Sequence, residues 1–157
     1  MTPGNLARLR FLARVIRKEC RHLETTDQRL FVTPITPARA ESLANDPDMA
    51  ERVEAFVGRF GRLQDTLADK LLPALLAALG EPSGPQIDNL DRAERLGWIE
   101  SSDEWLTIRQ LRNKMIHEYM EDMAILASAL QSGHDFVATL LRAANTMVNH
   151  LDSRGWP

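Results

Sequence analysis

The chain has very little of the residues on which several protein classes depend. It contains one cysteine, Cys20, and one tyrosine, Tyr119, and aromatic residues make up 6% of its 157 residues. A single cysteine excludes an internal disulfide and is typical of a protein from a reducing compartment. No segment is long and apolar enough to cross a bilayer, and the first residues lack the apolar core of a signal peptide. We therefore expect a cytoplasmic protein.

The remaining composition is that of one folded helical domain. Hydrophobic residues account for 44% of the chain and charged residues for 26%, which is globular rather than disordered. Leu and Ala dominate the apolar residues, and this favours helix over strand. A single domain spanning residues 1–157 is long enough to bury a core. The formal net charge of −3 provides no global basic field, so any affinity for RNA must be local.

Periodicity and capping signals predict the helices of the first half. Apolar residues at helical spacing predict a helix over 5–23, and a polar, turn-prone loop follows over 24–36. Thr36-Pro37 and Asp46-Pro47 each place proline after an N-cap, and they open a short helix and then the longest helix. Pro73 lacks a backbone donor and should bend the last turns of that long helix.

The second half carries equally clear stop and start signals. A break over 80–85 ends the long helix. A shorter helix follows it, and Gly97 is placed as its C-terminal cap. A capping-box pattern over 101–104 opens a helix that should continue to about Leu130, and Gly133 separates it from the last helix. No strand alternation or internal repeat is visible. The expected fold is an all-α bundle of four main helices plus short ones.

The helix that follows Ser101 carries a cation and a phenol on its apolar face. Arg112 and Tyr119 are seven residues apart and nearly superimposed on a helical wheel. A buried guanidinium is costly unless it is paired or reaches a polar cavity. Arg112 therefore either extends to solvent, pairs with a carboxylate from a neighbouring helix, or serves a function. The apolar stripe that surrounds it consists of Ile108, Leu111, Met115, Ile116, Met123, Leu126 and Leu130.

His117 does not share the face of Arg112. Five residues correspond to a rotation of about 140°, so a straight helix separates the two side chains. Either the helix is distorted here, or a second subunit completes a shared site. Asn113 lies one turn before His117 and can orient its ring.

Residues 111–119, Leu-Arg-Asn-Lys-Met-Ile-His-Glu-Tyr, contain the pattern Arg-x4-His-x-Tyr. In an all-α chain of this length, the pattern resembles the HEPN superfamily and is most similar to the HepT toxins. The likeness extends to the Leu96-Gly97 turn, the capped start at Ser101 and an upstream helix rich in Phe and Leu. It covers roughly residues 50–150.

The resemblance implies a symmetric homodimer whose two motif helices meet at a composite cleft. It implies a metal-independent endoribonuclease toxin without a cofactor, and a minimal nucleotidyltransferase partner that acts as antitoxin. Arg112 and His117 would be catalytic. Tyr119 would be a site residue and also the target of AMP transfer, which silences the RNase. Asn113 stands where the family often has a small polar residue.

These residue types fit RNA cleavage through its own 2′-hydroxyl, which needs a base, an acid and a cation. Imidazole can exchange a proton near neutral pH, and a dimer brings two copies of His117 to one cleft. Arg112 has a planar fork for phosphate oxygens and can stabilise the transition state. Tyr119 can hydrogen-bond a phosphate oxygen. The product would carry a 2′,3′-cyclic phosphate.

Other charged and aromatic residues leave alternatives open. A basic stripe on the first helix is either a solvated face or a track for RNA phosphates or an acidic partner, and it consists of Arg10, Arg14, Arg17, Lys18 and Arg21. His22, His134 and His150 show no metal-ligand spacing with Cys20, which falls on an apolar stripe. A second hypothesis is a non-catalytic subunit that presents Tyr119 and the cleft to a nucleotidyltransferase. A plain structural bundle would leave Arg112 unexplained.

Overall fold

The structure, a computed structural model, describes residues 2–118 and 121–156, and all of its regular elements there are helical. The predicted all-α fold is confirmed. In chain order the elements are α1 (Pro3–Leu30), α2 (Pro37–Glu41), the 3₁₀ turn η1 (Ser42–Asn45), α3 (Pro47–Asp65), the π-helical segment η2 (Thr66–Leu71), α4 (Leu72–Ala78), α5 (Gln86–Arg95), α6 (Ser102–Glu118) and α7 (Met123–Ser153).

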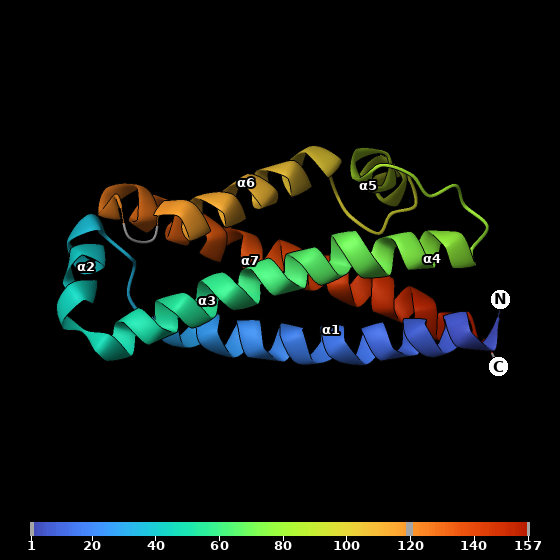
Figure 1. Cartoon of the computed structure of the whole chain (residues 1–157), viewed down its shortest axis with the longest axis horizontal. Coiled ribbons are helices and arrows are strands. Elements are labelled where there is room, and N and C mark those ends of the chain that lie inside the picture. The colour runs from blue at the N-terminus through green and yellow to red at the C-terminus, as the bar shows by residue number, and fades with distance from the viewer. Residues whose placement is uncertain (1, 119–120, 157) are drawn as a thin grey trace.

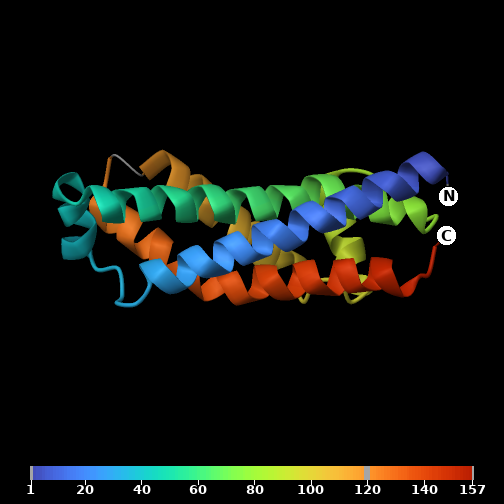
Figure 2. The same ribbon diagram turned by 90° about the horizontal axis from the view of Figure 1, so that it is seen from below.

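The long helices form an elongated bundle. α1 packs against α3 and α7, and α6 packs against α7 and α3, so α1 and α6 lie on opposite faces of the bundle (Figure 1). The start of α1 and the end of α7 lie together at one end, and α2 with η1 covers the other end (Figure 2). In the described part of the chain, no helix combines the length and the apolar character that crossing a bilayer requires.

The core follows the predicted faces of the longest helices. All seven residues predicted to point inward from the long helix are fully buried, namely Val53, Phe56, Phe60, Leu63, Leu67, Leu71 and Leu75. Leu9, Leu12, Ala13, Ile16 and Leu23 of α1 are buried as well, and Cys20 packs beside them. Burying this apolar surface is the main favourable term in folding.

The first helix is longer than its periodicity predicted. α1 continues to Leu30, so the predicted loop over 24–36 is wrong for its first seven residues. Thr26 and Leu30 extend the buried face at helical spacing, while the polar side chains between them point mostly to solvent. A polar stretch can remain helical when each of its few buried positions falls on the core-facing side.

Pro73, which was expected to bend the last turns of the long helix, directly follows a π-helical segment and the first residue of α4. α3, η2 and α4 follow one another without a break from Pro47 to Ala78, and the N–H of Leu72 bonds to the carbonyl of Leu67, five residues earlier. A proline at 73 lacks an N–H and its ring would clash with the carbonyl of Asp69 in a regular helix. The wider π turn accommodates both effects.

The helix that carries the Arg-x4-His pattern is shorter than predicted. α6 ends at Glu118 rather than near Leu130, and α7 begins at Met123, where the Asp122 side chain accepts hydrogen bonds from the N–H groups of Ala124 and Ile125. The predicted apolar stripe is therefore divided between two helices. Its member Ile116 is exposed rather than buried.

Gly133 does not separate two helices, as the sequence suggested, but lies buried inside α7. A Cβ atom at this position would lie 3.4 Å from Met115 Sδ and 3.4 Å from Phe56 Cε1. The glycine therefore permits the close packing of α7 on α6 and α3, which is a tertiary reason for its presence rather than a helix stop.

The predicted caps are present. Gly97 has φ +77°, and the bonds Gly97 N–H to Glu94 O and Trp98 N–H to Ala93 O form a Schellman motif. Ser101 Oγ accepts from Glu104 N–H at 3.1 Å. The Glu104 carboxylate accepts instead from Thr139 Oγ1 of α7. The cap therefore also connects α6 to α7.

Candidate functional site

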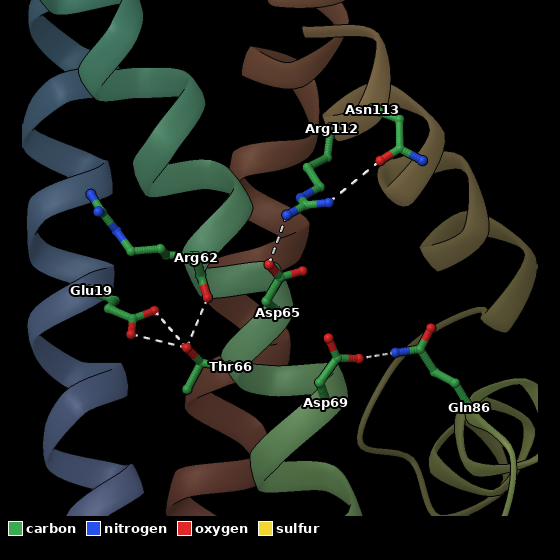
Figure 3. Close-up of polar contacts among 8 residues, drawn as sticks. All are labelled: Glu19, Arg62, Asp65, Thr66, Asp69, Gln86, Arg112 and Asn113. Atoms are coloured by element: carbon green, nitrogen blue, oxygen red, sulfur yellow. Dashed lines mark hydrogen bonds and ion pairs between the residues drawn. The ribbon is translucent and has the colours of Figure 1, made fainter. Parts of the chain in front are cut away.

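Arg112 is held against α3 by a carboxylate and a glycine. Its Nη2 lies 2.9 Å from Asp65 Oδ2, and the side chain reaches from α6 to the last residue of α3 (Figure 3). A Cβ atom on Gly61 would lie 3.3 Å from Arg112 Nε and 3.4 Å from Arg112 Cγ. The side chain thus crosses α3 at a point where any larger residue would make it shift by a few tenths of an ångström. Of the readings left open by the sequence, pairing with a neighbouring helix is the one observed.

The hydrogen-bonding capacity of Arg112 is only partly used. Nη2 donates to Asp65, and Nη1 is 3.4 Å from Asn113 Oδ1, which is a long and weak contact. Nε is buried and has no hydrogen-bond partner among the residues that the structure describes. The side chain of Arg112 is 33% exposed and that of Asp65 is 38% exposed. A guanidinium has five donors, so this group retains donors for a further acceptor.

His117 lies in the last turn of α6 and is exposed. No hydrogen bond or ion pair joins it to Arg112 or Asn113, all three of which are described. Asn113, expected to orient His117, lies instead beside Arg112. Tyr119, the third predicted catalytic residue and the predicted site of AMP transfer, lies outside the described residues. One chain therefore does not bring Arg112 and His117 together.

Asp65 and Gly61 were not identified from the sequence. Gly61 does carry a signal, because a glycine inside a long apolar-periodic helix needs a packing reason. Asp65 follows one turn later and so lies beside Gly61 on the helix surface. Nothing in the sequence pairs this face of α3 with Arg112, since the partner comes from a helix 47 positions further along the chain.

A second polar cluster lies next to Asp65. Thr66 Oγ1 is 3.0 and 3.1 Å from the carboxylate oxygens of Glu19 and 2.8 Å from the carbonyl oxygen of Arg62 (Figure 3). Desolvation by burial raises the pKa of the Glu19 carboxyl above its ordinary value of 4.5. The Thr66 hydrogen bond and the charges of Arg62 and Lys70 oppose part of this shift.

Glu19→Gln is expected to raise the free energy of unfolding at pH 7. Because its pKa is raised by folding, the stability that Glu19 contributes is complete below pH 4.5 and is lost as the pH rises through the folded pKa. The neutral amide avoids that loss, so the advantage of the variant should disappear below pH 4.5. Urea unfolding between pH 3.5 and 8 measures the difference in the free energy of unfolding between the variant and wild type. Glu24→Gln, at an exposed position of the same helix, is the control. A variant less stable than wild type at pH 7 would contradict the prediction.

The basic stripe of α1 is partly occupied by contacts with the end of the chain. Arg10 donates to the carbonyl oxygen of Trp156 at 2.9 Å, and Arg17 pairs with Asp152. The other three members, Arg14, Lys18 and Arg21, are exposed and make no ion pair with the residues that the structure describes. The helix that carries the stripe, α1, lies on the opposite face of the bundle from α6, which carries Arg112 (Figure 1).

His134 and Cys20 have structural surroundings. His134 Nδ1 lies 2.6 Å from Asp27 Oδ1 and its ring stacks on Phe31, so it is not a free surface residue. Burial raises the pKa of the Cys20 thiol to about 11, which disfavours the thiolate that a nucleophile needs. Within residues 2–118 and 121–156, no group of three or more His, Cys, Asp or Glu side chains is placed to hold a metal ion.

No protein-family model, no curated protein and no solved structure matches this chain significantly.

Proposed function

We propose that the chain is the toxin of a HepT-like toxin–antitoxin pair and that it cleaves RNA without a metal. The observation that carries this proposal is the state of Arg112, a half-buried cation fixed on α3 with unused donors. Such a group suits a phosphate oxygen, which accepts from two guanidinium N–H groups at once. His117 follows five residues later on the same helix and supplies a group for proton transfer.

A dimer would complete the site. In one chain Arg112 faces α3 and His117 is exposed at the end of α6, without contact between them. Two large apolar residues are exposed close to this helix end in the sequence, Ile116 at 45% and Ile125 at 42%. Burying them against a second copy would join the two α6 ends and bring two His117 side chains to one cleft. One could then act as base and the other as acid.

Ile116→Glu is expected to produce a monomer that retains its helical content and loses RNase activity. A charge at this position would be buried unpaired in a symmetric interface, which is strongly unfavourable. Sedimentation at micromolar concentration and far-UV circular dichroism measure the two properties. Ile87→Glu is the matched control, because Ile87 is 56% exposed on α5, away from the α6 end. A wild-type protein that sediments as a monomer would remove the composite-site argument.

The proposal includes control by a minimal nucleotidyltransferase. This partner would transfer AMP from ATP to the hydroxyl of Tyr119. The phenol oxygen forms the new bond to the α-phosphorus, pyrophosphate leaves, and the phenol proton passes to a base. The attached phosphate would then compete with RNA for Arg112.

Expression with and without such a partner tests both parts of the proposal. The wild-type chain alone should arrest growth and degrade RNA, and His117→Ala should do neither. With the partner present, growth should recover and the peptide that contains Tyr119 should gain one or more AMP masses, whereas Tyr119→Phe should not. No arrest by the wild-type chain alone contradicts the toxin. Full recovery without an adduct contradicts the covalent mechanism and leaves inhibition by complex formation.

One observation favours a second function, that of a non-catalytic subunit of a nucleotidyltransferase. Asp65 neutralises much of the charge of Arg112 within a single chain, and His117 lies apart from it. In that function the cleft would bind the partner or its nucleotide. A chain that binds the nucleotidyltransferase but causes no RNA breakdown when expressed alone would select this function.

A further inference from the structure

A hollow lies between the last turns of α1 and the first half of α3. Its volume is about 250 Å³, and its lining consists of Thr26 and Arg29 of α1 and Asp48, Glu51, Arg52, Ala55 and Arg59 of α3. The α3 members recur at intervals of three and four residues, so they form one line along that helix. Ala55 stands between Arg52 and Arg59 in this line, and its small side chain leaves room between the two arginines.

Arg59 reaches from α3 to α1 at this hollow. Its Nη1 lies 3.3 Å from the carbonyl oxygen of His22 and also donates to Thr26 Oγ1. Thr26 belongs to the lining, so the guanidinium is held at the wall of the hollow. A guanidinium has donors on all three nitrogens. Those on Nε and Nη2 make no hydrogen bond with the residues that the structure describes.

The other two arginines of the hollow are unpaired. The side chains of Arg29 and Arg52 make no ion pair or hydrogen bond within the described part of the chain, although Asp48 and Glu51 belong to the same lining. The two acidic residues are exposed, so water and salt screen their charges, whereas Arg52 and Arg59 are half-buried. Three arginines against two carboxylates also leave the lining with a net positive charge.

Further cations extend this positive surface along both helices. Lys18 lies eleven residues before Arg29, so the two share one face of α1, and Lys18 is exposed. Arg62 is exposed as well. It extends from α3 toward α1, and its charge acts on the carboxyl group of Glu19 (Figure 3). Because the whole chain has a formal net charge of −3, this gathering of cations is a local feature rather than part of a general excess.

We propose that the hollow between α1 and α3 binds a phosphate group of an RNA strand. Phosphate oxygens accept charge-assisted hydrogen bonds from guanidinium groups, and Arg29, Arg52 and Arg59 supply the donors. The choice of RNA rests on the proposed function. α3 lies between α1 and α6 (Figure 1), so a strand held in the hollow crosses α3 to reach Arg112. A helix with its side chains is about 10–12 Å wide, which a short stretch of RNA spans.

Binding of RNA to the His117→Ala protein tests the hollow without cleavage. Fluorescence anisotropy of a short, labelled, single-stranded RNA gives the affinity over a range of salt concentrations. Each phosphate contact contributes about 0.7 to the slope of log K against log salt concentration. Adding Arg29→Gln and Arg52→Gln should therefore reduce this slope by about 1.4 and weaken binding about ten-fold or more at low salt. Arg59 is left unchanged because it joins α3 to α1.

Two further variants control for charge and for folding. Arg95→Gln removes an exposed arginine from α5, outside the hollow, and should leave the affinity and the slope unchanged. Glu51→Gln removes a negative charge from the lining and should strengthen binding by about two-fold, as expected for one exposed charge. Damage to the fold would not strengthen binding. Circular dichroism confirms that each variant is folded.

The proposal is overturned if the His117→Ala protein does not bind RNA at low salt. It is also overturned if the double substitution keeps the parent affinity and slope, or if Arg95→Gln reduces them equally. Inorganic phosphate, titrated at constant ionic strength and followed through the ¹⁵N signals of the arginine side chains, is the second probe. Phosphate binding without an effect of the double substitution on RNA indicates a site for a free anion and overturns the RNA assignment. RNA binding through the hollow by a wild-type chain that cleaves no RNA contradicts the RNase alone.

Discussion

Arg112→Ala and His117→Ala are each expected to reduce the rate of RNA cleavage by the purified protein by about 100-fold or more. Removing a donor that stabilises transition-state charge costs about 10²–10³-fold in rate, and losing a general acid or base costs about 10²–10⁴-fold. Both variants should keep the helical fold. The ion pair of Arg112 with Asp65 is partly exposed and such pairs contribute little stability, and His117 is exposed. Single-turnover cleavage of a labelled single-stranded RNA measures the rate.

Two controls define this result. Lys114→Ala removes an exposed charge from the same helix and should leave the rate within about two-fold, since exposed charges contribute little. Excess EDTA should not change the wild-type rate, and the products should end in 2′,3′-cyclic phosphate. Full activity of either the Arg112 or the His117 variant, or loss of activity with the chelator, would show that the chemistry lies elsewhere.

Gly61→Ala is expected to lower the cleavage rate about ten-fold while leaving the protein at least as stable as wild type. The new methyl group would lie 3.3 Å from Arg112 Nε, so the guanidinium must shift by a few tenths of an ångström. Small displacements of a catalytic group reduce rates steeply, by as much as about 10²-fold for 1 Å. Alanine also stabilises a helix interior relative to glycine by about 0.5–1 kcal/mol. Activity and stability should therefore change in opposite directions.

The neighbouring glycine provides a matched control. A Cβ atom on Gly58 would lie 3.6 Å from Arg62 Nη2, an ordinary contact, so Gly58→Ala should gain the helix stability without losing activity. The cleavage rates and melting temperatures of Gly61→Ala and Gly58→Ala show whether the loss of activity is specific to the position beside Arg112. Equal rates for Gly61→Ala and wild type would show that the position of Arg112 on α3 does not matter for cleavage.

A substitution at Asp65 tests the placement of Arg112 by changing a neighbouring charge rather than the volume of a neighbouring side chain. The Asp65 carboxylate holds Arg112 and, in the proposed RNase, would also repel an RNA phosphate. Asp65→Asn should therefore lower kcat, because the guanidinium is held less firmly, and should leave KM unchanged or lower it. A residue that mattered only for folding would not separate the two constants in this way.

The sequence predicted local features better than distant ones. The caps at Ser101 and Gly97 and the buried face that includes Phe56 and Phe60 are confirmed, because each depends on neighbouring residues. The end of α6 was missed because apolar residues continue at helical spacing into α7, so periodicity alone shows no break there. Gly133 was taken for a helix stop because its reason, the contact with Met115, comes from another helix.

In the candidate site, too, the local features were predicted and the contacts between distant residues were not. The periodicity of the apolar stripe placed Arg112 on the inner side of its helix, and the structure agrees that the residue is only partly exposed. The identity of its partner could not be predicted, since Asp65 lies on a helix whose orientation depends on the whole bundle. The separation of Arg112 from His117 did follow from helix geometry, and the structure shows no contact between them.

The π-helical segment also explains why four leucines spaced four residues apart in the long helix can all face the core. Leu63, Leu67, Leu71 and Leu75 follow one another at intervals of four residues, and all are fully buried. In a regular α-helix, each such interval overshoots a full turn by about 40°, so the last leucine would have rotated well away from the first. The wider turn of η2 absorbs this excess. The segment thus acts as a one-residue insertion, and deleting a residue within it would leave a regular α-helical turn with the α4 leucines still facing the core.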